Sequence, residues 1–121
     1  TKGGVSMTAK AGEDLRRICR LIDETLEAEK IYLFGSYAYG TPGANSDYDL
    51  CVVIPDGTLR PVDAVKKIRK ALYSQQDMPL DVIVYRASQF QQRQKAASLE
   101  RKIAREGVLL FERNGMEQRM A

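Results

Sequence analysis

Two long stretches of the chain place apolar residues at helical spacing. The first covers residues 8–28, and the second starts at Pro61 and continues to about Leu72. In both stretches charged residues fill the remaining positions, which predicts amphipathic helices with one side against a core. The apolar face of the first helix is expected to consist of Leu15, Ile18, Cys19, Ile22 and Leu26.

Shorter apolar runs predict β-strands at residues 31–34, 47–54, 78–85 and 108–111. The second half of the run at 47–54 is apolar on both faces, which predicts a strand in the middle of a sheet. Short helices are expected at about 37–40, 88–94 and 98–105. The resulting order is α-β-α-β-α-β-α-α-β, without an internal repeat or linker. We therefore expect an α+β fold, with a small mixed β-sheet and helices packed mainly on one face.

The composition excludes several kinds of chemistry. The 121 residues contain no His, which excludes a Ser-His-Asp or Cys-His catalytic centre and a His-ligated zinc site. The two cysteines, Cys19 and Cys51, are too few for a four-Cys metal site and occupy apolar positions. Reduced thiols are typical of a cytoplasmic protein, and we expect that localisation. Chemistry is left to carboxylates, Lys, Tyr or a metal held by oxygen ligands.

The charge of the chain is mildly basic, at +3 from 19 Lys and Arg against 16 Asp and Glu. One helix face is basic, but no aromatic residues alternate with its cations, so a solvated face is favoured over nucleic-acid binding. The cations of this face are Lys66, Lys67, Arg69 and Lys70. No apolar stretch approaches the ~20 residues of a membrane span, and we expect no membrane partner.

Candidate chemistry is concentrated in three aspartates. Asp47 and Asp49 are two residues apart on one strand, so their side chains point to the same face, with Cα atoms about 6–7 Å apart, and Tyr48 points to the other face. Two like charges this close are unfavourable unless a cation lies between them, and carboxylates suit Mg²⁺ or Mn²⁺. Asp81 begins another apolar strand, and all three carboxylates converge if that strand is adjacent. Solvated aspartates at strand starts are the alternative interpretation.

Gly35 and Ser36 follow the first predicted strand, where a helical turn begins. Glycine permits close approach of the backbone, and free N–H groups at a helix start bind phosphate, to which a Ser hydroxyl adds a donor. An ordinary strand-to-helix turn with Ser36 as the N-cap would have the same sequence. This pair of residues does not decide between the two interpretations.

In combination, these residues resemble the polymerase-β-type nucleotidyltransferase superfamily. The resemblance rests on Leu33-Phe34-Gly35-Ser36, a ten-residue spacer, Asp47-Tyr48-Asp49-Leu50, and Asp81 on a later strand. The short chain and the stretch Glu106-Gly107-Val108-Leu109-Leu110-Phe111 resemble the minimal nucleotidyltransferase (MNT) branch. The resemblance implies a palm-like fold, with residues 7–121 as a single nucleotidyltransferase domain. Residues 1–6 lack the apolar core of a signal peptide and are interpreted as a cloning remnant before Met7.

The resemblance also implies the roles of the residues. Gly35 and Ser36 would bind the phosphates of a nucleoside triphosphate, ATP in the first instance. Asp47, Asp49 and Asp81 would be catalytic and would bind two Mg²⁺ ions, with Mn²⁺ as an alternative. The acceptor oxygen would attack the α-phosphate, and pyrophosphate would leave.

Three functions are compatible with this resemblance. In the MNT branch, a nucleotidyltransferase antitoxin often pairs with a small helical, HEPN-type toxin that can offer a Tyr hydroxyl as acceptor. We expect such a partner, because the chain is too short for a separate acceptor-binding domain. A homodimeric enzyme that modifies a small molecule, as antibiotic nucleotidyltransferases do, is the first alternative. The second is a catalytically weak module that neutralises a partner by contact.

Two positions depart from the branch. Its members often read Gly-Ser-Arg-Ala-Arg-Gly where this chain has Gly35-Ser36-Tyr37-Ala38-Tyr39-Gly40. Arg grips phosphate in bidentate fashion, and Tyr cannot supply that charge. We expect Tyr37 and Tyr39 to pack or to contact a partner, and the loss of both cations favours the weak-module alternative.

Overall fold

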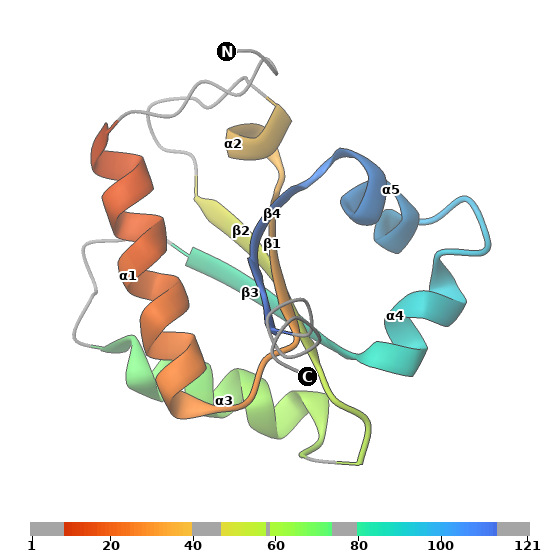
Figure 1. Cartoon of the computed structure of the whole chain (residues 1–121), viewed down its shortest axis with the longest axis horizontal. Coiled ribbons are helices and arrows are strands. Elements are labelled where there is room, and N and C mark those ends of the chain that lie inside the picture. The colour runs from red at the N-terminus through yellow and green to blue at the C-terminus, as the bar shows by residue number, and fades with distance from the viewer. Residues whose placement is uncertain (1–8, 40–46, 58, 74–79, 114–121) are drawn as a thin grey trace.

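The computed structural model describes residues 9–39, 47–57, 59–73 and 80–113. The elements follow the predicted order (Figure 1), as α1 (Ala9–Thr25), β1 (Lys30–Phe34), α2 (Ser36–Tyr39), β2 (Tyr48–Ile54), α3 (Pro61–Ala71), β3 (Leu80–Arg86), α4 (Ala87–Arg93), α5 (Leu99–Glu106) and β4 (Val108–Glu112). Each element is confirmed to within a few residues of its predicted bounds. The segment 1–6, interpreted as a cloning remnant, lies outside the described residues.

The sheet has β2 in an interior position, as its doubly apolar second half predicted. The strand order is β3-β2-β1-β4, with β1 antiparallel to both neighbours and β2 parallel to β3. Helix α3 makes the crossover that a parallel pair requires. Because of these directions, the starts of β2 and β3 and the end of β1 lie at the same edge of the sheet.

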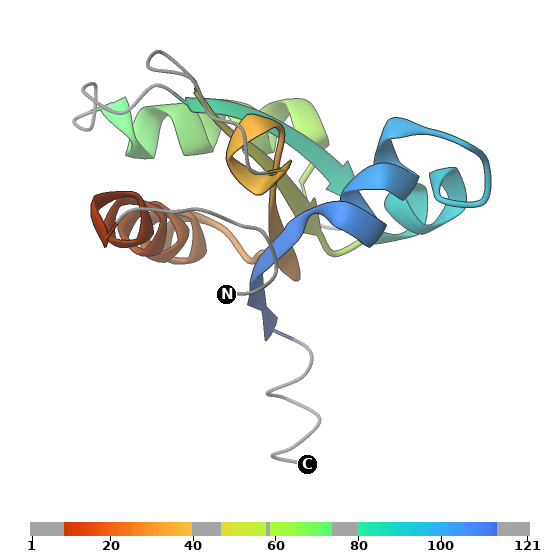
Figure 2. The ribbon, with the colours of Figure 1, turned by 90° about the horizontal axis from the view of Figure 1, so that it is seen from above.

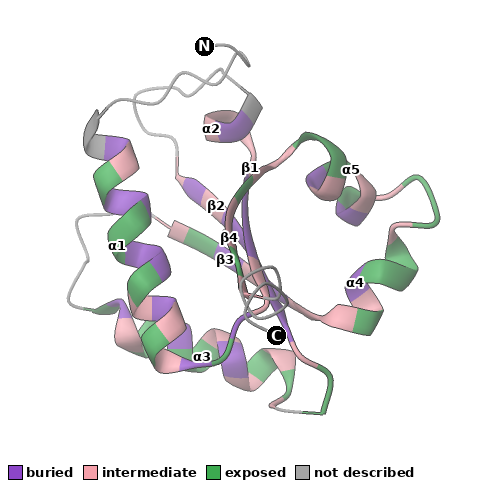
Figure 3. Cartoon of the chain, viewed as in Figure 1, coloured by how far each residue is buried: buried purple, intermediate pink, exposed green. Residues whose placement is uncertain are grey.

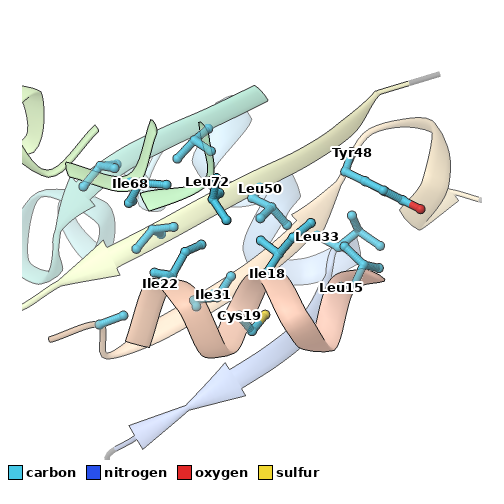
Figure 4. Close-up of a cluster of buried hydrophobic side chains, with 14 of the residues drawn as sticks. Leu15, Ile18, Cys19, Ile22, Ile31, Leu33, Tyr48, Leu50, Ile68 and Leu72 are labelled. Carbon is cyan, nitrogen blue, oxygen red and sulfur yellow. The ribbon is translucent and has the colours of Figure 1, made fainter. Parts of the chain in front are cut away.

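Helices cover both faces of the sheet (Figure 2), and the two long helices, α1 and α3, share one face. Figure 4 shows the main core on that face, where Ile18 and Ile22 of α1 and Ile68 of α3 meet the sheet. On the other face, Phe90 of α4 and Ile103 of α5 form a smaller cluster with residues of β1 and β2. This mixed sheet with its helices confirms the α+β class. Helices were expected mainly on one face, but α4 and α5 also cover the second, because Phe90 and Ile103 bury their side chains there. None of the helices in the described ranges is long and apolar enough to span a membrane.

A buried acid holds α5 against the sheet. Glu100, 6% exposed, accepts a hydrogen bond from the Tyr85 hydroxyl of β3. Its carboxylate also lies 3.6 Å from the guanidinium of Arg93 on α4. Burial alone would raise the pKa of Glu100, but the hydrogen bonds from Tyr85 and its other donors hold that pKa below its usual value. The ionised carboxylate therefore links β3, α4 and α5.

Replacing Glu100 by Gln is expected to destabilise the fold in a pH-dependent way. The pKa of Glu100 is lower in the folded than in the unfolded chain. Its contribution to stability is therefore complete above the unfolded value of about 4.3 and is lost as the pH falls through the folded value. We expect Glu100→Gln to lower the free energy of unfolding by about 1–3 kcal/mol at neutral pH, and by less in acid.

Urea denaturation at neutral pH and in acid measures this difference. Glu24→Gln, at an exposed position of α1, is the matched control and should change stability little at either pH. An equal loss for Glu100→Gln at both pH values would contradict the role of the ionised form.

Candidate functional site

Two of the three aspartates stand side by side at one edge of the sheet. In the parallel register of β2 and β3, Asp49 is the direct partner of Asp81. The prediction that these strands are adjacent is therefore confirmed. Tyr48 packs into the core of α1 and α3, so Asp49 points to the opposite face, where α4 and α5 lie. The predicted alternation of this segment is thus observed.

The electrostatics connect all three carboxylates. Asp49 is partly buried, and its pKa is raised by burial first, then by the charge of Asp81, then by that of Asp47. Both neighbours therefore lie close enough to Asp49 for their charges to act on it. Burial of like charges favours the neutral acid unless a cation compensates them. The site has the electrostatic character of a cation-binding site.

Gly35 lies directly against the Asp49 carboxylate. Its φ is +77°, and a Cβ built on it would lie only 2.1 Å from Asp49 Oδ2. The preceding residue, Phe34, is the antiparallel partner of Asp49. The turn after β1 thus lies against Asp49 on one side, and β3 lies beside Asp49 on the other. The approach expected at Gly35 was that of a phosphate, and it stays a prediction; the group that the structure places against this glycine is the Asp49 carboxylate.

Helix α2 starts at Ser36, and the Ala38 N–H donates to the Gly35 carbonyl at 3.0 Å. Tyr37 is partly buried, packs against the main core, and has its ring centroid 4.6 Å from that of Tyr48. The expectation that Tyr37 packs is therefore confirmed. The side chain of Tyr39 lies outside what the structure describes.

Asp14 is a residue of this region that sequence reasoning missed. It is only 5% exposed, and its carboxylate accepts hydrogen bonds from Tyr48 Oη at 3.1 Å and from Arg17 at 2.9 Å. Burial and the bond to Asp14 raise the pKa of Tyr48 to about 12. Because Tyr48 stands between Asp47 and Asp49, this bond anchors the start of β2 to α1. Nothing in the sequence distinguishes Asp14 from the solvated charges of that helix.

The donors suit a hard divalent cation. Carboxylate oxygens are the ligands that Mg²⁺ and Mn²⁺ prefer, and Asp47, Asp49 and Asp81 offer six of them. Across the described ranges, no three His, Cys, Asp or Glu side chains are already arranged to hold a metal ion. Asp81 is exposed, so its side chain has room to turn toward Asp49. The residues fit such an ion by chemistry and by strand register, and binding requires the side chains to close on it.

The family of the chain is indicated by a sequence comparison. A family model described as "Nucleotidyltransferase domain" matches residues 15–109, which include Gly35, Ser36 and the three aspartates. No curated protein matches the chain.

Solved structures share the fold. A candidate nucleotidyltransferase from Sulfolobus solfataricus is 17% identical with a TM-score of 0.64, and the match covers 94% of this chain and 91% of that one. A toxin-antitoxin structure with AMP-PNP matches at 27% identity and a TM-score of 0.58, over 88% and 79% of the chains. A complex of tri-AMPylated Shewanella oneidensis HEPN toxin with MNT antitoxin matches at 22% identity and a TM-score of 0.54, and the match covers 91% of this chain and 79% of that one. These matches confirm that the chain shares the fold of solved nucleotidyltransferase structures, an MNT antitoxin among them.

Replacing Gly35 by Ala tests the contact with Asp49. Gly57, with φ +82° and nothing within 4 Å of a built Cβ, is a control that carries backbone strain alone. We expect Gly57→Ala to lower the free energy of unfolding by about 1–2 kcal/mol, and Gly35→Ala by more, because it adds a clash with Oδ2. Urea denaturation measures both.

A double variant identifies the source of the extra loss. Removing the carboxylate with Asp49→Ala should restore part of the stability that Gly35→Ala removes, so the two changes should not be additive. Equal losses at Gly35 and Gly57, or additive effects in the double variant, would show that the contact is unimportant.

Proposed function

The chain belongs to the nucleotidyltransferase domain family, and on that premise we propose that it transfers AMP from ATP to a hydroxyl group of a small helical, HEPN-like partner. One observation carries the proposal: Asp49 stands in register with Asp81 while Gly35 is pressed against its carboxylate. Two relatives support the nucleotide and the partner. One relative, which is 27% identical to this chain, is a toxin-antitoxin crystallised with AMP-PNP. Another is an MNT antitoxin bound to an AMPylated HEPN toxin.

The residues would divide the work as follows. Gly35 and Ser36 would hold the terminal phosphates at the end of β1. Asp47, Asp49 and Asp81 would hold two Mg²⁺ ions, which would offset the negative charge of the triphosphate and the charge that develops on the oxygens of the α-phosphate and of the leaving pyrophosphate. The neutralised carboxylates would then no longer repel one another, and Asp49 would remain ionised despite its burial.

The reaction conserves its atoms without a further reagent. The acceptor oxygen forms a bond to the α-phosphorus, and the bond from that phosphorus to the bridging oxygen of pyrophosphate breaks. The hydroxyl proton passes to the carboxylate of Asp81, which is exposed and can therefore release it to water. Both cysteines are free and buried, and we place the reaction in the reducing cytoplasm.

One observation favours a second candidate, a weak module that neutralises its partner by contact. Tyr37 occupies a position where the branch often has Arg, and its ring is used in packing against Tyr48. It therefore supplies no cation to a triphosphate. If the module has lost catalysis, it should bind its partner without modifying it.

ATP labelled at different phosphates distinguishes these candidates. With Mg²⁺ and a cell extract, we expect label from the α-phosphate, and none from the γ-phosphate, to enter a small protein. Asp49→Asn and Asp81→Asn should each lower the rate at least about a hundredfold, because each removes a charge on the reacting centre. Glu24→Gln, far from the aspartates, is the matched control and should leave the rate unchanged.

The other outcomes each exclude the proposal. Label in a small molecule would support the antibiotic-type alternative. Transfer of the γ-phosphate would indicate a kinase-like reaction. No transfer, with binding of AMP-PNP retained, would support the weak module.

A further inference from the structure

Helix α3 is densely basic. It carries four basic residues and one acidic residue among its 11 residues, a net charge of +3. The basic residues of α3 are Lys66, Lys67, Arg69 and Lys70. A surface of this charge suits a polyanion.

Helix α3 has exposed positions along its length (Figure 3), and all four of its cations are among the exposed residues. Asp63, the acid of α3, is hydrogen-bonded to Arg60 at 2.9 Å, and the charges of Lys66 and Lys67 also lower its pKa. The outer side of α3 therefore presents four positive charges to solvent.

Exposed apolar side chains border this basic surface. Val62 is 51% exposed near the start of α3, and Tyr73 is 72% exposed just beyond its end. Tyr73 follows Lys66 by seven residues, so the two are separated by roughly 10 Å along the helix axis. The sequence did not suggest an aromatic side chain beside these cations, because Tyr73 falls at the end of the periodic pattern.

We propose that the α3 surface, defined as Lys66, Lys67, Arg69, Lys70 and Tyr73, binds single-stranded RNA. The cations would contact successive phosphates, and Tyr73 would stack on an unpaired base. Lysine is depleted in the centre of protein interfaces, which disfavours a protein occupant. The main core lies between α3 and the sheet face opposite Asp49, so this surface is separate from the aspartates.

Fluorescence anisotropy with a labelled oligouridine of about 15 nucleotides tests the proposal at low salt. The α3 variant replaces three exposed cations by Gln, at Lys66, Arg69 and Lys70. The matched α5 variant removes the same charge at Arg101, Lys102 and Arg105. We expect the α3 variant to bind at least about tenfold more weakly at 50 mM salt and to show a shallower salt dependence, and the α5 variant to change little. Circular dichroism checks that both remain folded.

Tyr73→Ala separates base stacking from charge. It should weaken RNA binding about fivefold or more without changing the salt dependence, and should leave binding of inorganic polyphosphate unchanged. Leu99→Ala, at a leucine that is 48% exposed on α5, is the control and should have no effect.

Four results would overturn the proposal. These are the absence of RNA binding by the wild type, an equal loss in the α5 variant, and an equal effect of Tyr73→Ala on polyphosphate. The fourth is loss of binding to phosphatidylserine vesicles in the α3 variant with RNA binding unchanged, which would make the surface a membrane contact.

Discussion

The structure is organised around the placing of one carboxylate among like charges. Asp49 is partly buried beside Asp81 and close to Asp47, and its raised pKa records the cost of that arrangement. The fold maintains it because β2 is held on both sides by hydrogen-bonded strands. Gly35 closes the site by lying where any side chain would collide with Oδ2. Negative charge concentrated in this way is unfavourable by itself, and the stability of the rest of the fold offsets it. A bound cation would remove this cost.

Two hydrogen bonds between side chains hold the strands that carry the aspartates against neighbouring helices. Asp14 and Tyr48 join α1 to the first residue of β2, immediately between two of the aspartates. On the other face, Glu100 joins α5 to β3 through Tyr85. Each pair is a buried polar contact between a helix and one of the two strands that carry the aspartates. Such contacts fix position more than they add stability, since a buried polar group must recover what desolvation costs.

Most helices and strands could be predicted because the local spacing of apolar residues determines them. The apolar face of α1 and the doubly apolar half of β2 follow directly from spacing. The packing of α4 and α5 against the face that carries Asp49 could not be predicted, because both helices are short and present few apolar residues. The meeting of Asp49 with Asp81 depended on strand order, which periodicity does not encode. Asp14 and Glu100 were missed because a buried acid looks like a solvated one until its partner, 34 or 15 residues away, is known.

The central claim, that the aspartates form a metal-dependent nucleotide site, is tested most directly by Mn²⁺ binding. Electron paramagnetic resonance of free Mn²⁺ counts the bound ions when the protein is titrated in the presence of AMP-PNP. The account predicts about two ions per chain for the wild type and a loss of at least one in Asp49→Asn. Glu24→Gln should bind as the wild type does. Equal Mn²⁺ binding by the wild type and by Asp49→Asn would contradict the account.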